Sequence, residues 1–165
     1  MIDLSKLSSL EIKTKQALIR PLFLEDVSTD YVDWLNNKEV NRFLESRFMV
    51  HSLQSCKEYV LSMLDSKEDF LYGIFDKENE FHIGNIKLSK VSLKHLNAEM
   101  GILIGNSNYW GRGIACEVIK SVTSFSFNCG LNRINAGVYD GNYGSIKAFE
   151  KAGYLREATL RDNRL

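Results

Sequence analysis

The sequence lacks the marks of several protein classes. None of its apolar runs approaches the length of a membrane span, and the N-terminal stretch has no apolar core of signal-peptide length. Its three cysteines, Cys56, Cys116 and Cys129, are an odd number without Cys-x-x-Cys spacing, which argues against a disulfide framework or a zinc site. The three histidines are isolated and show no metal-ligand spacing. We therefore expect a cytoplasmic protein with reduced thiols and no metal.

The chain also lacks net charge. Its 21 basic and 21 acidic residues cancel, and no basic block interrupts the sequence. Binding to nucleic acid or to a membrane surface depends on clustered Lys and Arg, so neither is expected as a partner. A small molecule or the end of a peptide is the expected partner. At 165 residues without repeats or low-complexity tracts, residues 1–165 are predicted to form one domain with its own core.

The most informative motif that is present is Trp-Gly-Arg-Gly-Ile-Ala at residues 110–115, before an amphipathic run at 116–127. Two glycines one residue apart allow a tight bend, and the helix that follows presents unpaired N–H groups suited to a pyrophosphate. The same residues also serve a purely geometric turn, so the motif alone leaves both interpretations open. A strand-like segment at 97–105 precedes it and favours the phosphate site. Without Gly-Lys-Ser/Thr or a third glycine, ATP and NAD are disfavoured.

Hydrophobic periodicity predicts the remaining elements. Strands are expected at 17–20, 70–75, 81–88, 99–104, 133–139 and 154–160. Helices are expected around 27–35, at 53–64 after Ser52 as N-cap, at 113–128 and at 142–151, with a polar and aromatic connection at 36–50. This order predicts an α/β domain with a mixed sheet.

Three stretches resemble the GCN5-related N-acetyltransferases, and within them the ribosomal-protein N-terminal acetyltransferases. They are the turn at 110–115, the run Asn-Tyr-Gly-Ser-Ile-Lys-Ala-Phe-Glu-Lys-Ala-Gly-Tyr at 142–154, and His-Ile-Gly-Asn-Ile at 82–86. With 18–22, the likeness spans about residues 17–160 and leaves 1–16 as a variable N-terminal segment. The resemblance implies a mostly antiparallel central sheet flanked by helices. It also implies acetyl transfer from acetyl-CoA to an amine.

The resemblance further implies which residues contact acetyl-CoA. The pyrophosphate would lie on the turn formed by Trp110, Gly111, Arg112, Gly113, Ile114 and Ala115. The pantetheine arm would pair with Leu103 and Ile104, where their strand diverges from its neighbour, and Asn142 would steady the arm while also serving as a helix N-cap. Ser145 matches the family's proton donor to the CoA sulfur, or is an ordinary polar residue of a first helical turn. Phe149 stands where other members have a tyrosine, and is expected in the core.

Glu99 is the candidate base, since a carboxylate at the start of the central strand can take a proton from an amine; alternatively it is a solvated strand end. An α-amine, with a pKa near 8, loses its proton more readily than a lysine amine near 10.4. This favours a protein N-terminus or an amino sugar as the acceptor, and the runs at 33–37 and 45–48 also look like acetyltransferases of nucleotide-linked amino sugars. The residues expected to bind the acceptor are Trp34, Arg42, Glu45 and Arg47.

The family pattern continues beyond Leu165 through the last strand of a terminal strand pair. We therefore expect an incomplete sheet with an exposed edge, or completion by a neighbouring copy in a homodimer. The absent tyrosine at Phe149 and the short C-terminal end leave a second possibility, a non-catalytic acyl-CoA-binding or regulatory domain. A third, a plain interaction module, would not bind CoA.

Overall fold

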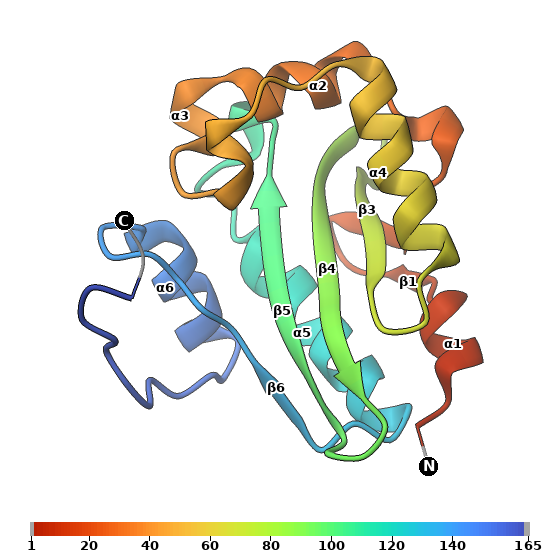
Figure 1. Ribbon diagram of the computed structural model, residues 1–165, viewed down its shortest axis with the longest axis vertical. Helices are drawn as coiled ribbons and strands as arrows, with labels where there is room; N and C mark the ends of the chain where they lie inside the picture. Colours follow the sequence, from red (N-terminus) through yellow and green to blue (C-terminus); the bar gives the residue numbers. More distant parts are fainter. Residues whose placement is uncertain (1, 164–165) are drawn as a thin grey trace.

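The computed structural model describes residues 2–163, which form one six-stranded sheet flanked by helices (Figure 1). The strands follow one another across the sheet in chain order: β1 Ile12–Lys13, β2 Ala17–Pro21, β3 Phe70–Asp76, β4 His82–Ser92, β5 Asn97–Ile104 and β6 Arg133–Asn135. Neighbours from β1 to β5 are antiparallel, whereas β5 and β6 are parallel. The α-helices are α1 Leu4–Ser8, α2 Thr29–Asn36, α3 Lys38–Asn41, α4 Leu53–Asp65, α5 Ile114–Asn128 and α6 Tyr143–Lys151.

Apolar side chains cover both faces of the sheet, as the run of buried residues in β3 illustrates. Alternate residues of a strand point to opposite faces. Tyr72 and Ile74 join one cluster, with Leu7 of α1 and core residues of α5 and α6, while Leu71 and Phe75 join the other, with α2 and α4. In Figure 1, α5 passes behind β4 and β5. The predicted mixed α/β fold is confirmed.

The helix ends are set by local signals that were readable in the sequence. Ser52 is the N-cap of α4 and accepts a hydrogen bond from the Ser55 N–H, as predicted. The helix expected at 113–128 is found at Ile114–Asn128, and the one expected at 142–151 is found at Tyr143–Lys151. None of the helices between residues 2 and 163 is both long and apolar enough to span a membrane.

The strand predicted at 154–160 is wrong. Residues 152–160 are irregular, and the side chains of Leu155 and Leu160 are 87% and 69% exposed. A strand requires a neighbour to complete its hydrogen bonds, and within residues 2–163 no strand lies beyond β6. An ion pair between Arg133 and Glu157 links this segment to β6. The strand expected at 133–139 is likewise shorter, because its pairing with β5 stops at Asn135.

The N-terminal segment, expected to be variable, is built into the fold. Strand β1 pairs with β2, and the side chains of Leu7 and Leu10 are fully buried. The hydroxyl of Tyr72 donates to the Leu7 carbonyl at 2.8 Å, which anchors α1 on β3. Leu7 and Leu10 therefore belong to the core, and the turn at 14–16 reaches the region of the site through Gln16.

Candidate active site

The turn between β5 and α5 has the backbone geometry of an anion cradle. Gly111 and Gly113 have φ angles of +73° and +81°, in the left-handed region that glycine occupies without strain. An added Cβ at either position would meet no atom within 4 Å. Glycine is therefore required by the backbone conformation, while the space over the turn stays open.

Several backbone N–H groups at the start of α5 have no hydrogen-bond partner in the described part of the chain. Gly113 is the N-cap and has no side chain to satisfy them, and the first hydrogen bond to its carbonyl comes from the Glu117 N–H at 3.1 Å. Within the described chain, the N–H groups of residues 111–116 donate to no protein acceptor. Together with the positive end of the helix dipole, these groups suit a phosphate or pyrophosphate.

Side chains of the turn hold its shape. The indole N–H of Trp110 donates to the Ile104 carbonyl at 2.7 Å, which fastens the turn to the end of β5. The guanidinium carbon of Arg112 lies 4.9 Å from the centre of the Tyr109 ring. Trp110 thus fixes the turn to the end of β5, and the Arg112 side chain lies at the surface beside Tyr109.

Strands β5 and β6 diverge immediately before this turn. Their pairing covers three positions, from Asn97 opposite Arg133 to Glu99 opposite Asn135. From Met100 to Ile104, β5 is paired with β4 alone, and Figure 1 shows its far end separating from the chain that follows β6. Leu103 and Ile104, the residues predicted to hold a pantetheine arm, lie in this unpaired part. Apart from the Ile104 carbonyl, which accepts from Trp110, the peptide groups on the edge that faces away from β4 can pair with an extended ligand.

The first turn of α6 carries Asn142 and Ser145. Asn142 is the N-cap, and its side-chain oxygen accepts from the Ser145 N–H at 3.2 Å. Both residues are half-buried. Phe149 is buried as expected and meets the ring of Tyr154 edge to face at 5.0 Å. Packing of Phe149 against the α5 side of the sheet fixes α6 beside the diverging strands.

Glu99 occupies the last position at which β5 is paired with β6, and the two strands separate after it. Its carboxylate lies 3.0 Å from the ammonium of Lys90, and both side chains are exposed. Ion pairs of this exposed kind contribute little to stability. Because the Glu99 side chain is exposed, its carboxylate is accessible at the point where β5 and β6 begin to separate.

The connection after α3 comes close to the loop before α6. The Tyr139 hydroxyl donates to the carboxylate of Glu45, and the Arg47 guanidinium carbon lies 4.9 Å from the centre of the Tyr139 ring. Arg42 instead lies 4.7 Å from the ring of its neighbour Phe43. The structure thus brings Glu45 and Arg47 to the N-terminal side of α6, and leaves Arg42 at the exposed surface.

Trp34, predicted to bind the acceptor, is 8% exposed and packs against Gly105 at the end of β5. Its ring centre lies 5.1 Å from that of His82. This placement favours a packing role, since little of the indole is open to an acceptor. Trp34 thus supports the end of β5 from the α2 side.

His82 is enclosed in the same aromatic cluster. Its Nε2 lies 2.8 Å from the Asn85 Oδ1 and 2.9 Å from the Gly84 carbonyl, so Nε2 carries the proton. Nδ1 is buried without a hydrogen-bond partner. Burial lowers the pKa of His82 below its ordinary value, against the opposing effect of the Asn85 hydrogen bond. His82 is a neutral packing residue.

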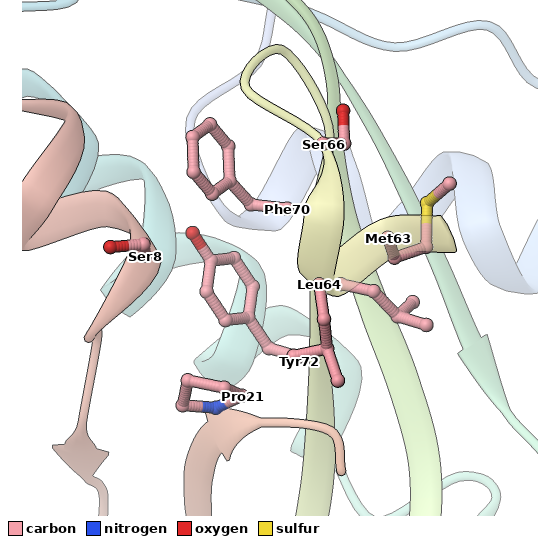
Figure 2. A pocket seen from close by; sticks show the side chains of 8 residues that line it. Ser8, Pro21, Met63, Leu64, Ser66, Phe70 and Tyr72 are labelled. Atoms are coloured by element: carbon pink, nitrogen blue, oxygen red, sulfur yellow. The ribbon is translucent and has the colours of Figure 1, made fainter. Parts of the chain in front are cut away.

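A small hollow elsewhere in the molecule is unrelated to these residues (Figure 2). It measures about 40 Å³ and lies between α1, the end of α4 and strands β2 and β3. Its wall is formed by Ser8, Pro21, Met63, Leu64, Ser66, Phe70, Leu71 and Tyr72. A hollow of this size holds one or two water molecules. No predicted site residue lines it.

Gln16 lies in the site region and was not predicted from the sequence. Gln16, in the turn between β1 and β2, hydrogen-bonds to both Arg112 and Glu117. It lies 96 and 101 positions away from them, and no local pattern distinguishes it from any other polar turn residue.

Comparison with known proteins agrees with this geometry. A model of the acetyltransferase (GNAT) domain matches residues 16–155. Uncharacterized N-acetyltransferase YoaA of Bacillus subtilis is 29% identical over 153 residues, covering 91% of this chain and 85% of that protein. Probable N-acetyltransferase YjcK of the same organism is 26% identical over 162 residues, covering 92% and 87%. Spermidine N-acetyltransferase of Vibrio cholerae, whose crystal structure contains CoA and spermine, has the same fold with a TM-score of 0.77, 21% identity and coverage of 89% and 85%.

Proposed function

Because this chain belongs to the GNAT acetyltransferase family, we propose that it transfers the acetyl group of acetyl-CoA to a primary amine, either a protein N-terminus or a small-molecule amine such as an amino sugar. Acyltransferase activity and use of acetyl-CoA are properties of this family. The proposal rests on two features that follow one another along the chain. They are the open turn at 110–115 and the edge of β5 at 100–104, which is not paired with β6.

The residues present fit acetyl-CoA. The pyrophosphate is assigned to the free N–H groups of Gly111 to Ala115, where no side chain stands in the way. The pantetheine arm is assigned to the edge of β5 at Leu103 and Ile104 that faces away from β4, where the Ile104 carbonyl already accepts from Trp110. The amide groups of the arm can pair with the remaining peptide groups of this edge. Asn142, at the start of α6, is assigned a contact with the pantetheine arm on the side opposite to β5. Acetyl-CoA, when bound, supplies the acetyl group as a thioester.

The transfer requires two proton movements that this chain's residues can perform. The amine nitrogen forms a bond to the acetyl carbon as the carbon–sulfur bond breaks, the amine loses a proton and the thiolate gains one. Glu99 is assigned as the base, acting on the amine directly or through water. Ser145 is assigned as the donor to the sulfur, since Phe149 has no proton to give. N–H groups of the β5 edge can stabilise the developing oxyanion.

The acceptor is assigned to the side of the divergence covered by the connection after α3. Glu45 and Arg47, held against Tyr139, provide charged groups there, and Arg42 lies at the outer surface. Spermine is present in the crystal structure of the Vibrio cholerae spermidine enzyme, which supports an amine in general as the acceptor. An α-amine or amino sugar remains our preferred class, because these amines are more easily deprotonated than lysine.

The test is release of free CoA thiol from acetyl-CoA in the presence of a panel of amines. The panel contains peptides with free N-termini, nucleotide-linked amino sugars, polyamines and lysine. Turnover with any of them supports the proposal, and the acceptor preference assigns the class. A protein that binds acetyl-CoA but releases no thiol with any amine would instead be the non-catalytic acyl-CoA-binding domain.

A further inference from the structure

The turn between β1 and β2 is tied to the phosphate turn through Gln16. The Gln16 side-chain amide donates to the Glu117 carboxylate at 2.9 Å and to the Arg112 carbonyl at 3.4 Å. The backbone N–H of Gln16 donates to the second carboxylate oxygen at 3.0 Å. The Gln16 carbonyl accepts from the Lys77 N–H at 3.0 Å, which adds the β3–β4 turn. One residue thus joins three loops and the first turn of α5.

Glu117 is held ionised by this arrangement. Partial burial works against its charge, but hydrogen bonds from Thr14 and Gln16 outweigh it and lower the pKa of the carboxyl. A negative charge in the first turn of α5 is favourable toward the helix dipole. With its oxygens occupied by donors of the β1–β2 turn, this charge orders that turn.

The backbone at Arg112 depends on contacts from outside the turn to keep its conformation. It lies between Gly111 and Gly113, and glycine adopts many backbone conformations at similar free energy, so the turn has little stiffness of its own. Gln16 holds the carbonyl between the two glycines, while Trp110 holds the turn at its start. The two contacts restrict the backbone of the turn from both sides.

We propose that Gln16 is a positioning residue for acetyl-CoA, which holds the phosphate turn in its binding conformation through Arg112 and Glu117. The inference rests on the proposed function, because it presumes a pyrophosphate at this turn. Gln16 acts through the turn and is not assigned a contact with the reacting atoms. Its effect should therefore be restricted to donors that carry a pyrophosphate.

The test compares Gln16→Ala with Gln54→Ala. Gln54 is the matched control, because its amide also donates to a glutamate, Glu58 at 2.7 Å, but on the exposed surface of α4. The dissociation constant of acetyl-CoA is measured by calorimetry, and kcat/KM is measured with acetyl-CoA and with S-acetylpantetheine, which lacks the pyrophosphate. Gln16→Ala loses the side-chain bonds to the Glu117 carboxylate and to the Arg112 carbonyl and keeps the backbone bond to Glu117, so it should raise the dissociation constant about threefold to tenfold.

We expect Gln16→Ala to lower kcat/KM with acetyl-CoA by a similar factor and to leave kcat/KM with S-acetylpantetheine unchanged, while Gln54→Ala changes neither. Unchanged affinity in Gln16→Ala, or equal loss with both donors, would overturn this inference alone. A wild-type protein that binds no acetyl-CoA would overturn the proposed function and this inference together.

Discussion

Replacement of Gly105 by alanine should destabilise the protein through a clash with one side chain. The added Cβ would lie 2.1 Å from Cε3 and 2.2 Å from Cδ2 of the Trp34 ring. That ring is buried and is hemmed in by Tyr31 at 6.1 Å and His82 at 5.1 Å between ring centres. Because the indole has little room to move, the end of β5 must shift instead.

The expected size of this effect follows from two opposing contributions. Overpacking of a tight core costs about 1–3 kcal/mol. The φ angle of Gly105 lies outside the left-handed region, so alanine also restricts the unfolded chain and returns about 0.4–1 kcal/mol. The net loss should be up to about 2.6 kcal/mol, which lowers Tm by up to roughly 10 °C in a chain of this size.

Urea unfolding of four proteins tests this reasoning: wild type, Gly105→Ala, Trp34→Leu and the double variant. If the clash is the cause, Gly105→Ala should cost little in the Trp34→Leu background, where space is available. Gly144→Ala is the control, because an added Cβ there meets nothing and lies in helix α6, where alanine is preferred. An equal cost of Gly105→Ala in both backgrounds would refute the packing role assigned to Trp34.

Four further substitutions test individual assignments. Because the pKa of His82 is lowered in the folded state, the unfolded state binds a proton more readily below about pH 6.5. The free energy of unfolding of the wild type, measured by urea titration, should therefore decrease as the pH is lowered, by at most about 1.4 kcal/mol per pH unit. An unchanged slope in His82→Asn would contradict this. Glu99→Gln should lower kcat/KM about 10²-fold or more in steady-state assays at unchanged Tm, and a loss below threefold would remove Glu99 as the base. Ser145→Ala should lower kcat about tenfold or more without weakening CoA binding in calorimetry, whereas weakened binding alone would make Ser145 a binding residue. Trp110→Phe loses the indole hydrogen bond to Ile104 and should weaken acetyl-CoA binding about threefold to tenfold in calorimetry, and unchanged affinity would contradict its supporting role.

Local signals in the sequence predicted α5 and its turn well. Gly111 and Gly113 are required by backbone conformation alone, and the apolar spacing of α5 reports the face that it buries. These features depend on residues that are close in the chain. The same holds for the Ser52 cap of α4 and for Asn142 at the start of α6.

Features that depend on distant partners were not predictable in this way. The segment 154–160 has residues compatible with a strand, but whether a strand forms depends on a neighbour beyond β6. Trp34 is an aromatic residue that could line a site or fill a core, and the small Gly105 opposite it decides the outcome. The contact of Glu45 with Tyr139 joins positions 94 residues apart. The roles assigned to the site residues remain predictions.

The most direct test of the acetyl-CoA site is a melting curve with and without acetyl-CoA for wild type, Gly113→Asn and Gly113→Asp. Asn and Asp are similar in size and both tolerate the left-handed conformation, so their difference reports the added charge beside the pyrophosphate. At a hundred times its dissociation constant, acetyl-CoA should stabilise the wild type by about 2.7 kcal/mol, or roughly 5–11 °C in Tm. We predict that Gly113→Asn retains part of this shift and Gly113→Asp loses it. No shift of the wild type at millimolar acetyl-CoA, or an equal shift in the Asp variant, would contradict the site.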